Sequence, residues 1–431
     1  MNDEENIKCE PGYFLPDDYK KCLKCSVEKC DKCQGTKLSN ICLSCKSYLT
    51  PIYEENKIKY CKYTCETGLD EKCKKCDEIK NECSSCNSGY KLINGKCIIN
   101  YSFKATYLSE YKNENIKLIN KLPSNNIEMI VDDEIITKAT LNYTFPNVGL
   151  HSILFLININ EVNSLKSMFK EVTSIKSIAF TNIFDTQNIK NMSKMFYYCT
   201  GLTSVEISNF KTNEVTDMSY MFYYCLKLTS INISLFNTEK VTKMNDMFNF
   251  CSSLTSINII NFNTKNVVDM SRMFYNCSKL ENLNLYNFDT SKVTNMAYMF
   301  SICFSITSID ISNFNTSNVV NMESIFSSCV KLKSIDLSHI NTKNVINMKD
   351  MFSSCFSFTS IDLSKFDTSK VTDMSYMFAL CDKLISIDVS NFNTSNLSNM
   401  NSMFYGCSSI SSINLLNFNT NNVKDMSYLP Y

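Results

Sequence analysis

The strongest constraint on this chain is a 26-residue period in its second part. Blocks such as "MSYMFYYC" at 218–225 return as "MSYMFALC" at 374–381, with no insertion between units. Each block ends in a cysteine, and these are Cys199, Cys225, Cys251, Cys277, Cys303, Cys329, Cys355, Cys381 and Cys407. A fixed period of this length is typical of a solenoid, in which each unit buries its apolar face by stacking on its neighbours. We therefore predict a solenoid over 163–431.

Each unit has the pattern of a short helix followed by a short strand. In the unit that begins at Asp217, five apolar residues follow the helical spacing i, i+3, i+4, i+7 and i+10: Met218, Met221, Phe222, Cys225 and Leu228. This spacing predicts a helix of two to three turns with Asp217 as its cap. A strand is predicted at 230–234, and "FNT" at 236–238 predicts a turn. The predicted fold class is an α/β solenoid with 26-residue, leucine-rich-repeat-like units.

The repeats resemble a known family. The blocks M-S-x-M-F-x-x-C, L-x-S-I-x-L and F-N-T-x-x-V are similar to those of BspA-like leucine-rich-repeat surface proteins. The resemblance implies a secreted or cell-surface adhesin or interaction protein, an extracellular or cell-surface location, and a protein or host-cell surface as partner. It names no ligand.

Residues 1–98 hold the other 14 of the 23 cysteines. They are Cys9, Cys22, Cys25, Cys30, Cys33, Cys42, Cys45, Cys61, Cys65, Cys73, Cys76, Cys83, Cys86 and Cys97. Their even number and density predict a disulfide-rich module made in an oxidising compartment. Paired C-x-x-C spacing also suits zinc, which stays the alternative, although sites of four cysteines would leave two over. The stretch "CSSCNSGYKLINGKC" at 83–97 resembles furin-like and growth-factor-receptor cysteine-rich modules.

Between these parts, residues 100–162 contain no cysteine and alternate between apolar and polar residues. Stretches such as "LNYTFPNVGLHSILFLI" at 141–157 have the pattern of paired strands. We predict a small β-sandwich that caps the solenoid, with an independent binding domain as the alternative.

Composition limits the functions open to the chain. Lys and Arg together number 43, as do Asp and Glu, so no basic field favours nucleic acid. No apolar run is long enough for a transmembrane helix, and the first residues lack a signal peptide. This start indicates a mature or truncated chain, or one that stays inside the cell; the final "MSYLPY" suggests truncation there too. With two His, eight Gly and no catalytic motif, we predict no enzyme activity, no catalytic residue and no cofactor.

The candidate binding face is the outward row of the predicted strands. Four successive units place an acid there, Asp310, Asp336, Asp362 and Asp388, and Tyr286 stands beside them. Parallel strands stack about 4.8 Å apart, so these carboxylates should repel unless a cation or a basic partner relieves them. A solvated polar face and a ligand-binding face, for Ca²⁺ or for a basic protein, both stay open. No other metal site is predicted.

We therefore expect an adhesin or interaction protein that presents one long face of its solenoid. One alternative is a receptor-like or coat protein in which the cysteine-rich module binds and the solenoid is a spacer. A third is an intracellular zinc-binding scaffold. The nine periodic cysteines should be free, because packed helices lie about 8–10 Å apart and a disulfide needs Cα atoms within about 7 Å.

Overall fold

The computed structural model describes residues 102–122, 127–132, 134–136, 140–157 and 162–429, together with the backbone of ten short strands between Tyr13 and Ile99. Side chains are described for 102–122, 129–132, 140–157 and 162–429. The chain divides into two compact units, Met1–Asn100 and Tyr101–Tyr431.

In the first unit the ten strands form four small antiparallel sheets, β1-β2, β3-β4-β6-β5, β7-β8 and β9-β10. The strands are β1 (Tyr13–Phe14), β2 (Leu23–Lys24), β3 (Cys30–Gly35), β4 (Asn40–Cys45), β5 (Leu49–Glu54), β6 (Lys57–Tyr63), β7 (Cys73–Asp77), β8 (Glu82–Cys86), β9 (Tyr90–Ile93) and β10 (Lys96–Ile99). The backbone register sets Cys33 opposite Cys42 and Cys76 opposite Cys83.

The predicted disulfides of Cys9 to Cys97 lie outside the residues whose side chains are described. Among the described cysteines, all of which belong to the repeats, none forms a disulfide. The structure therefore characterises the first unit by its short β-hairpins, and the disulfide-rich class predicted for it is not supported.

The second unit begins with a six-stranded sheet in the order β14-β13-β16-β11-β17-β18, and a separate pair, β12-β15. The strands are β11 (Phe103–Ser109), β12 (Glu114–Lys117), β13 (Ile127–Val131), β14 (Glu134–Ile136), β15 (Asn142–Phe145), β16 (Gly149–Ile157), β17 (Ile175–Phe180) and β18 (Ser204–Glu206). All neighbours are antiparallel except β17 and β18, which run parallel. Because β17 and β18 belong to the first repeats, the sheet does not close within 100–162. The predicted small β-sandwich is wrong, because β11, β13, β14 and β16 belong to one sheet that continues into the first repeats.

The sheet and the first repeat share one core. Phe103 on β11 lies opposite Phe155 on β16 in register, and their rings stack with centroids 4.6 Å apart. The ring of Phe103 also meets Phe169 and Phe184 of the first repeat edge to face, at 5.6 and 5.9 Å. Strand β11 is thereby packed directly against the first repeat.

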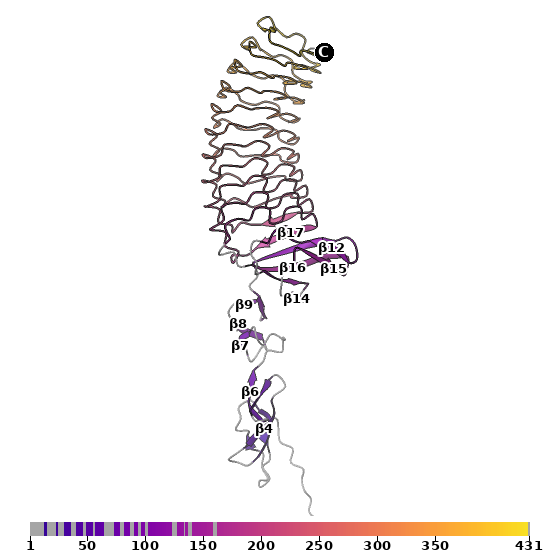
Figure 1. Ribbon diagram of the computed structural model, residues 1–431, viewed down its shortest axis with the longest axis vertical. Coiled ribbons are helices and arrows are strands. Elements are labelled where there is room, and N and C mark those ends of the chain that lie inside the picture. Colours follow the sequence, from indigo (N-terminus) through magenta and orange to yellow (C-terminus); the bar gives the residue numbers. More distant parts are fainter. Residues whose placement is uncertain are drawn as a thin grey trace, which may run out of the picture. The chain divides into compact units, whose positions relative to one another are not determined.

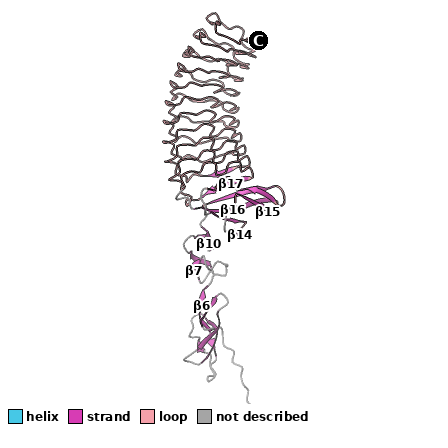
Figure 2. Ribbon diagram, in the orientation of Figure 1, coloured by secondary structure: helices cyan, strands magenta, loops and turns pink. Residues whose placement is uncertain are grey.

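From Ser164 to Leu429 each unit makes one coil, and the coils lie one on the next; we call this region the repeat stack (Figure 1). Isolated parallel bridges join equivalent residues of successive units, as in Asn191 to Asp217 and Asp217 to Lys243. Beyond β18 the described repeats consist of turns, bends and such bridges, and within the second unit Figure 2 shows strands only at its start.

The predicted helix is a run of tight turns. Within the unit, the N–H of Met221 donates to the carbonyl oxygen of Met218 over 3.3 Å. Alternate N–H groups cross to the next coil instead, as from Tyr220 to Asn245 over 3.0 Å. Tyr220 and Tyr224 have φ of 58° and 62°, in the left-handed region, and they redirect the chain every four residues. A helix would keep all these hydrogen bonds within the unit.

The predicted α/β solenoid is therefore wrong as a fold class. No residue that the structure describes lies in a helix, and the strand expected at 230–234 is irregular chain that ends in a turn at Ser234. The predicted burial is right: Met218, Met221, Phe222, Cys225 and Leu228 are all fully buried. In the run of tight turns, two inward residues alternate with two outward ones. Over eight residues this pattern coincides with the apolar stripe of a helix, so the sequence pattern fits both the helix and the turns.

A column of phenylalanines runs through the centre of the repeat stack. Phe222, Phe248 and Phe274 stack in succession with centroids 5.7 Å apart and nearly parallel rings. Beside this column each periodic cysteine donates its thiol to a phenylalanine carbonyl of the preceding unit, as from Cys225 Sγ to Phe196 O over 3.2 Å. All nine periodic cysteines are free, which confirms that prediction.

Candidate interaction surfaces of the repeat stack

The four predicted acids lie at equivalent positions of successive units, and all are exposed. Each carboxylate caps a tight turn by accepting the backbone N–H of the serine two residues later. Asp310 Oδ1 accepts from Ser312 over 3.0 Å, and Asp336 Oδ1 accepts from Ser338 over 2.9 Å. Asp362 and Asp388 make the same contact. We call these four residues the Asp row.

Mutual repulsion does not dominate the charge state of the Asp row. Hydrogen bonds from the backbone and hydroxyl of Ser312 hold the pKa of Asp310 below its usual value, and the opposing effect of Asp336 is smaller. The pKa of Asp336 is likewise lowered, chiefly by the backbone N–H of Ser338. The expectation that stacking strains these carboxylates is therefore wrong, because the turn stabilises their ionised form. The row is a set of four charged groups at neutral pH.

The Asp row has few charged neighbours. None of its four carboxylates forms an ion pair within the part of the chain that the structure describes. His339 and Lys365 are close enough to favour the ionised forms of Asp336 and Asp362 without contacting them. Among described residues no three His, Cys, Asp or Glu side chains gather as a metal ion requires. The geometry thus gives no support to the Ca²⁺ alternative.

Three apolar side chains precede the Asp row on the same side of the coils. Leu235, Ile260 and Tyr286 belong to three successive units and are 70, 39 and 69% exposed. Most other units place Ser or Asn at these positions, for example Ser312 and Asn313. The position tolerates polar residues, so the coil does not require this apolar trio. We call the trio and the Asp row together the acid-apolar face.

A second surface feature was not singled out from the sequence. On the side formed by the tight turns, six rings of three successive units lie together: Tyr197, Tyr198, Tyr220, Tyr223, Tyr224 and Phe250. Tyr197 stacks on Tyr223 at 4.7 Å, and Tyr198 stacks on Tyr224 at 4.6 Å. The doublet "YYC" in two successive units was the available signal. Two later units hold Ser at both positions of the doublet: Ser327 and Ser328, and Ser353 and Ser354.

Cations and acids extend this tyrosine cluster along the stack. The ammonium of Lys194 lies over the ring of Tyr220 at 5.0 Å, and the guanidinium of Arg272 lies over Tyr298 at 4.7 Å. Between them Asp246 is buried, and it accepts from Nδ2 of Asn249 over 2.6 Å. Burial raises the pKa of Asp246 despite that hydrogen bond. Because these groups contact one another across successive coils, the cluster is explained by its role in holding the coils together.

The described residues offer little for catalysis. The periodic thiols are the obvious nucleophiles, yet burial raises the pKa of Cys199 to about 12 and that of Cys303 to about 12. A thiol in that state is a packing group, because the reactive form is the thiolate.

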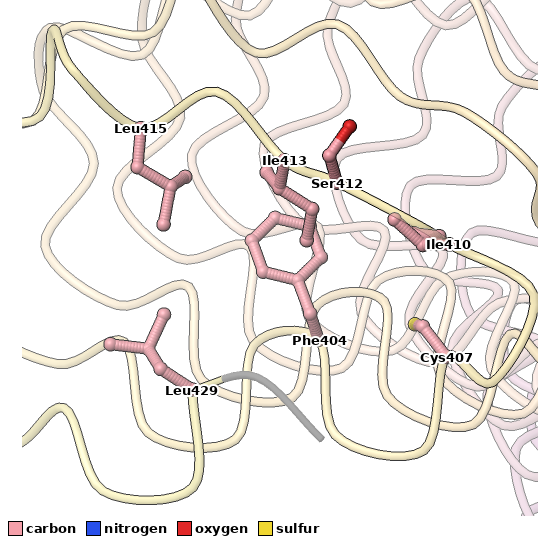
Figure 3. Close-up of a pocket in the computed structure, with 7 residues that line it drawn as sticks. All are labelled: Phe404, Cys407, Ile410, Ser412, Ile413, Leu415 and Leu429. Carbon is pink, nitrogen blue, oxygen red and sulfur yellow. The ribbon is translucent and has the colours of Figure 1, made fainter.

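Two cavities of the described part of the chain bear on a small-molecule site. One, of about 150 Å³, lies beside the last coils and is lined mainly by apolar side chains (Figure 3). Its lining residues are Phe404, Cys407, Ile410, Ser412, Ile413, Leu415 and Leu429, and the hydroxyl of Ser412 points away from the ring of Phe404. The other, of about 200 Å³, lies around Ser164 and includes Lys121 and Lys166. The first cavity offers few polar side chains to fix a small substrate.

The comparison with protein families agrees with the extent of the repeats. The family model described as "Mycoplasma protein of unknown function, DUF285" matches residues 163–258, 251–361 and 331–430. Together these matches cover the repeat stack and more than half of the chain, so the chain belongs to the DUF285 family. No curated protein matches it. No segment of the described chain forms a helix that could span a bilayer.

Proposed function

We propose that the chain is a secreted or cell-surface interaction protein, and that its acid-apolar face binds a protein partner. The observation that carries this proposal is the apolar trio of Leu235, Ile260 and Tyr286, exposed in successive units where the repeat itself is satisfied by Ser or Asn. Exposed apolar groups that the fold does not need are typical of interaction sites.

The Asp row indicates the chemistry of the partner. Its four carboxylates are ionised, exposed and without ion pairs among the described residues. A partner that carries basic side chains beside an apolar one would match the face along its length. Charge complementarity of this kind raises the association rate and makes binding sensitive to salt. The expected partner is therefore a basic protein surface, such as a host-cell or matrix protein presents.

The test is a binding screen of the full chain against matrix proteins and whole cells, followed by two variants. In the first variant, Asp310, Asp336, Asp362 and Asp388 are replaced by Asn. Other units carry Asn at this position and keep the turn: Oδ1 of Asn284 accepts the N–H of Tyr286 over 3.0 Å. In the second, Leu235→Asn, Ile260→Ser and Tyr286→Ser are combined. We expect each variant to bind at least about tenfold more weakly, and the first to lose most of the salt dependence.

Phe304→Ser combined with Tyr376→Ser is the control, because both are exposed apolar side chains that do not belong to the acid-apolar face. Unchanged binding by both test variants would refute the proposal. If residues 1–100 alone then competed for the partner, the receptor-like alternative with the repeats as a spacer would hold. Stoichiometric zinc in the purified chain would favour the intracellular scaffold.

A further inference from the structure

His151 is a buried histidine whose two ring nitrogens both meet hydrogen-bond acceptors. It stands near the start of β16, and its side chain is 8% exposed. Nδ1 lies 2.6 Å from Oδ2 of Asp132, and Nε2 lies 2.9 Å from the carbonyl oxygen of Asn147. A neutral imidazole carries one N–H and one lone pair, so it can donate to only one of these oxygens. Both contacts are hydrogen bonds only when the ring is an imidazolium.

We propose that His151 is held as an imidazolium and acts as a pH-sensitive clip on the edge of the sheet. Asp132 lies directly after β13, and Asn147 lies between β15 and β16. The charged ring ties both turns to β16. Loss of its proton leaves a lone pair facing either the carboxylate of Asp132 or the carbonyl of Asn147. The edge strands β13 and β14 then loosen from β16.

The surroundings of the ring favour its charged form. Asp132 is fixed in place, because its Oδ1 accepts the N–H of Ser152 over 2.9 Å and its own N–H donates to the Ser152 carbonyl over 3.0 Å. The ring of Phe145 stacks on His151 at 4.0 Å. An aromatic face attracts a cation, and a carboxylate at hydrogen-bond distance attracts it more strongly.

Two other titratable groups of the described residues can be placed beside His151. Asp132 contacts it directly, and Tyr107 lies opposite His151 in the register of β11 and β16. Burial holds the pKa of Tyr107 well above its usual value, and its hydroxyl donates to the Leu118 carbonyl over 2.9 Å. Tyr107 therefore stays neutral. Across the described residues no second ion pair to His151 is found, so Asp132 alone balances the ring.

The loosening should begin at the sheet edge. β14 is the outermost strand and pairs only with β13, which in turn pairs with β16 at Val131 and Ile153, next to the clip. The opposite edge is continued by β17 and β18 of the repeat stack and has no such contact. The loosening caused by loss of the proton from His151 is thus confined to β13, β14 and the start of β16.

The chain contains two histidines, so the clip can be observed without interference. His339 is replaced by Asn, because Asn391 makes the equivalent contact: its Nδ2 donates to the Leu363 carbonyl of the preceding coil, as Nε2 of His339 meets the Ile311 carbonyl. In this background the ring of His151 is the single histidine signal in a nitrogen-15 spectrum. We expect two protonated ring nitrogens at pH 5.5 and one at pH 8.5.

Amide hydrogen exchange, corrected for its intrinsic pH dependence, is the second measurement. Peptides covering 127–132 and 149–157 should lose at least about fivefold in protection between pH 5.5 and 8.5, while peptides from 244–262 should not. Asp132→Asn is the decisive variant: its amide can donate to a neutral ring, so the sheet should stay intact and the pH effect should vanish. A singly protonated ring at pH 5.5, or an equal pH effect in parent and Asp132→Asn, would overturn the proposal.

Discussion

Thr238 binds both polar backbone groups of Asn263 in the next coil. Its hydroxyl donates to the Asn263 carbonyl oxygen over 2.9 Å and accepts the Asn263 N–H over 2.8 Å. The side chain is fully buried, and a threonine stands at this position in every complete unit from Thr212 to Thr420. One threonine hydroxyl per coil thereby joins that coil to the backbone of the next one through two hydrogen bonds.

Thr238→Val should therefore destabilise the repeats around it. Valine has the shape of threonine, so the change removes the two hydrogen bonds and leaves both backbone groups of Asn263 unpaired. We expect a local loss of about 1–3 kcal/mol, measured by amide hydrogen exchange of 236–264 in the full chain. Thr242→Val is the control, because Val268 and Val320 occupy the equivalent exposed position in other units. Equal effects of the two substitutions would contradict the role given to Thr238.

The phenylalanine column predicts a second measurable loss. Phe274 is fully buried and stacks on Phe248 and Phe300, at 5.7 and 6.1 Å. Phe274→Ala should cost about 3–5 kcal/mol in local stability, because it opens a cavity between two coils. Phe304→Ala, at a side chain that is 43% exposed, should cost far less. Urea unfolding with peptide-resolved exchange compares the two, and a loss below about 1 kcal/mol for Phe274→Ala would place it outside the core.

The sequence predicted the core but not the backbone that carries it. Burial depends on which residues are apolar, so Met221 and Phe222 were placed correctly. The choice between helix and turns depends on Tyr220 and Tyr224, which adopt positive φ without being Gly or Asn. Tertiary hydrogen bonds to the next coil hold them there, as from Tyr224 N–H to the Asn249 carbonyl over 2.7 Å. No pattern within one unit reveals such a contact.

The candidate site was predicted in the same partial way. Exposure of Asp310 followed from its place between Ile309 and Ile311, both buried. The charge state of Asp310 could not be predicted, because the hydrogen bond that stabilises the carboxylate comes from Ser312, in a turn that was predicted as a strand. Ile260 and Tyr286 could be recognised as breaks in a polar row, whereas Leu235 stands one residue further along its unit and joins them only in the folded coil.

The repeat thiols should react in an order set by burial. Cys407 is the one periodic cysteine that is partly exposed, and burial raises its pKa to about 11, against about 12 for Cys303. Iodoacetamide at pH 8 should therefore modify Cys407 at least about tenfold faster than Cys303, since access and thiolate fraction both favour it. Peptide mass spectrometry of the native chain measures this. Equal rates would mean that the stack opens as a whole before any thiol reacts.

Asp350 predicts how the stability of the repeat stack depends on pH. Burial raises the pKa of its carboxyl to about 6, and the charges of Glu323 and Asp373 add to the rise. In the unfolded chain an aspartate titrates near its ordinary value of about 3.9. As the pH falls from about 6 towards 4, the folded state therefore takes up a proton that the unfolded state does not, and stability rises. Above pH 6 the ionised carboxylate lowers stability.

Asp350→Asn removes this charge and keeps a residue that tolerates the φ of 55° found there. We expect its melting temperature at pH 7.5 to exceed that of the parent by ~1–3 °C, a small gain because solvent screens a partly exposed group. The gain should shrink to nothing by pH 4. Asp336→Asn is the matched control, because its pKa is lowered by the Ser338 N–H and it should show no gain at neutral pH. A gain for Asp350→Asn that persisted unchanged at pH 4 would show that the carboxylate's charge is not its cause.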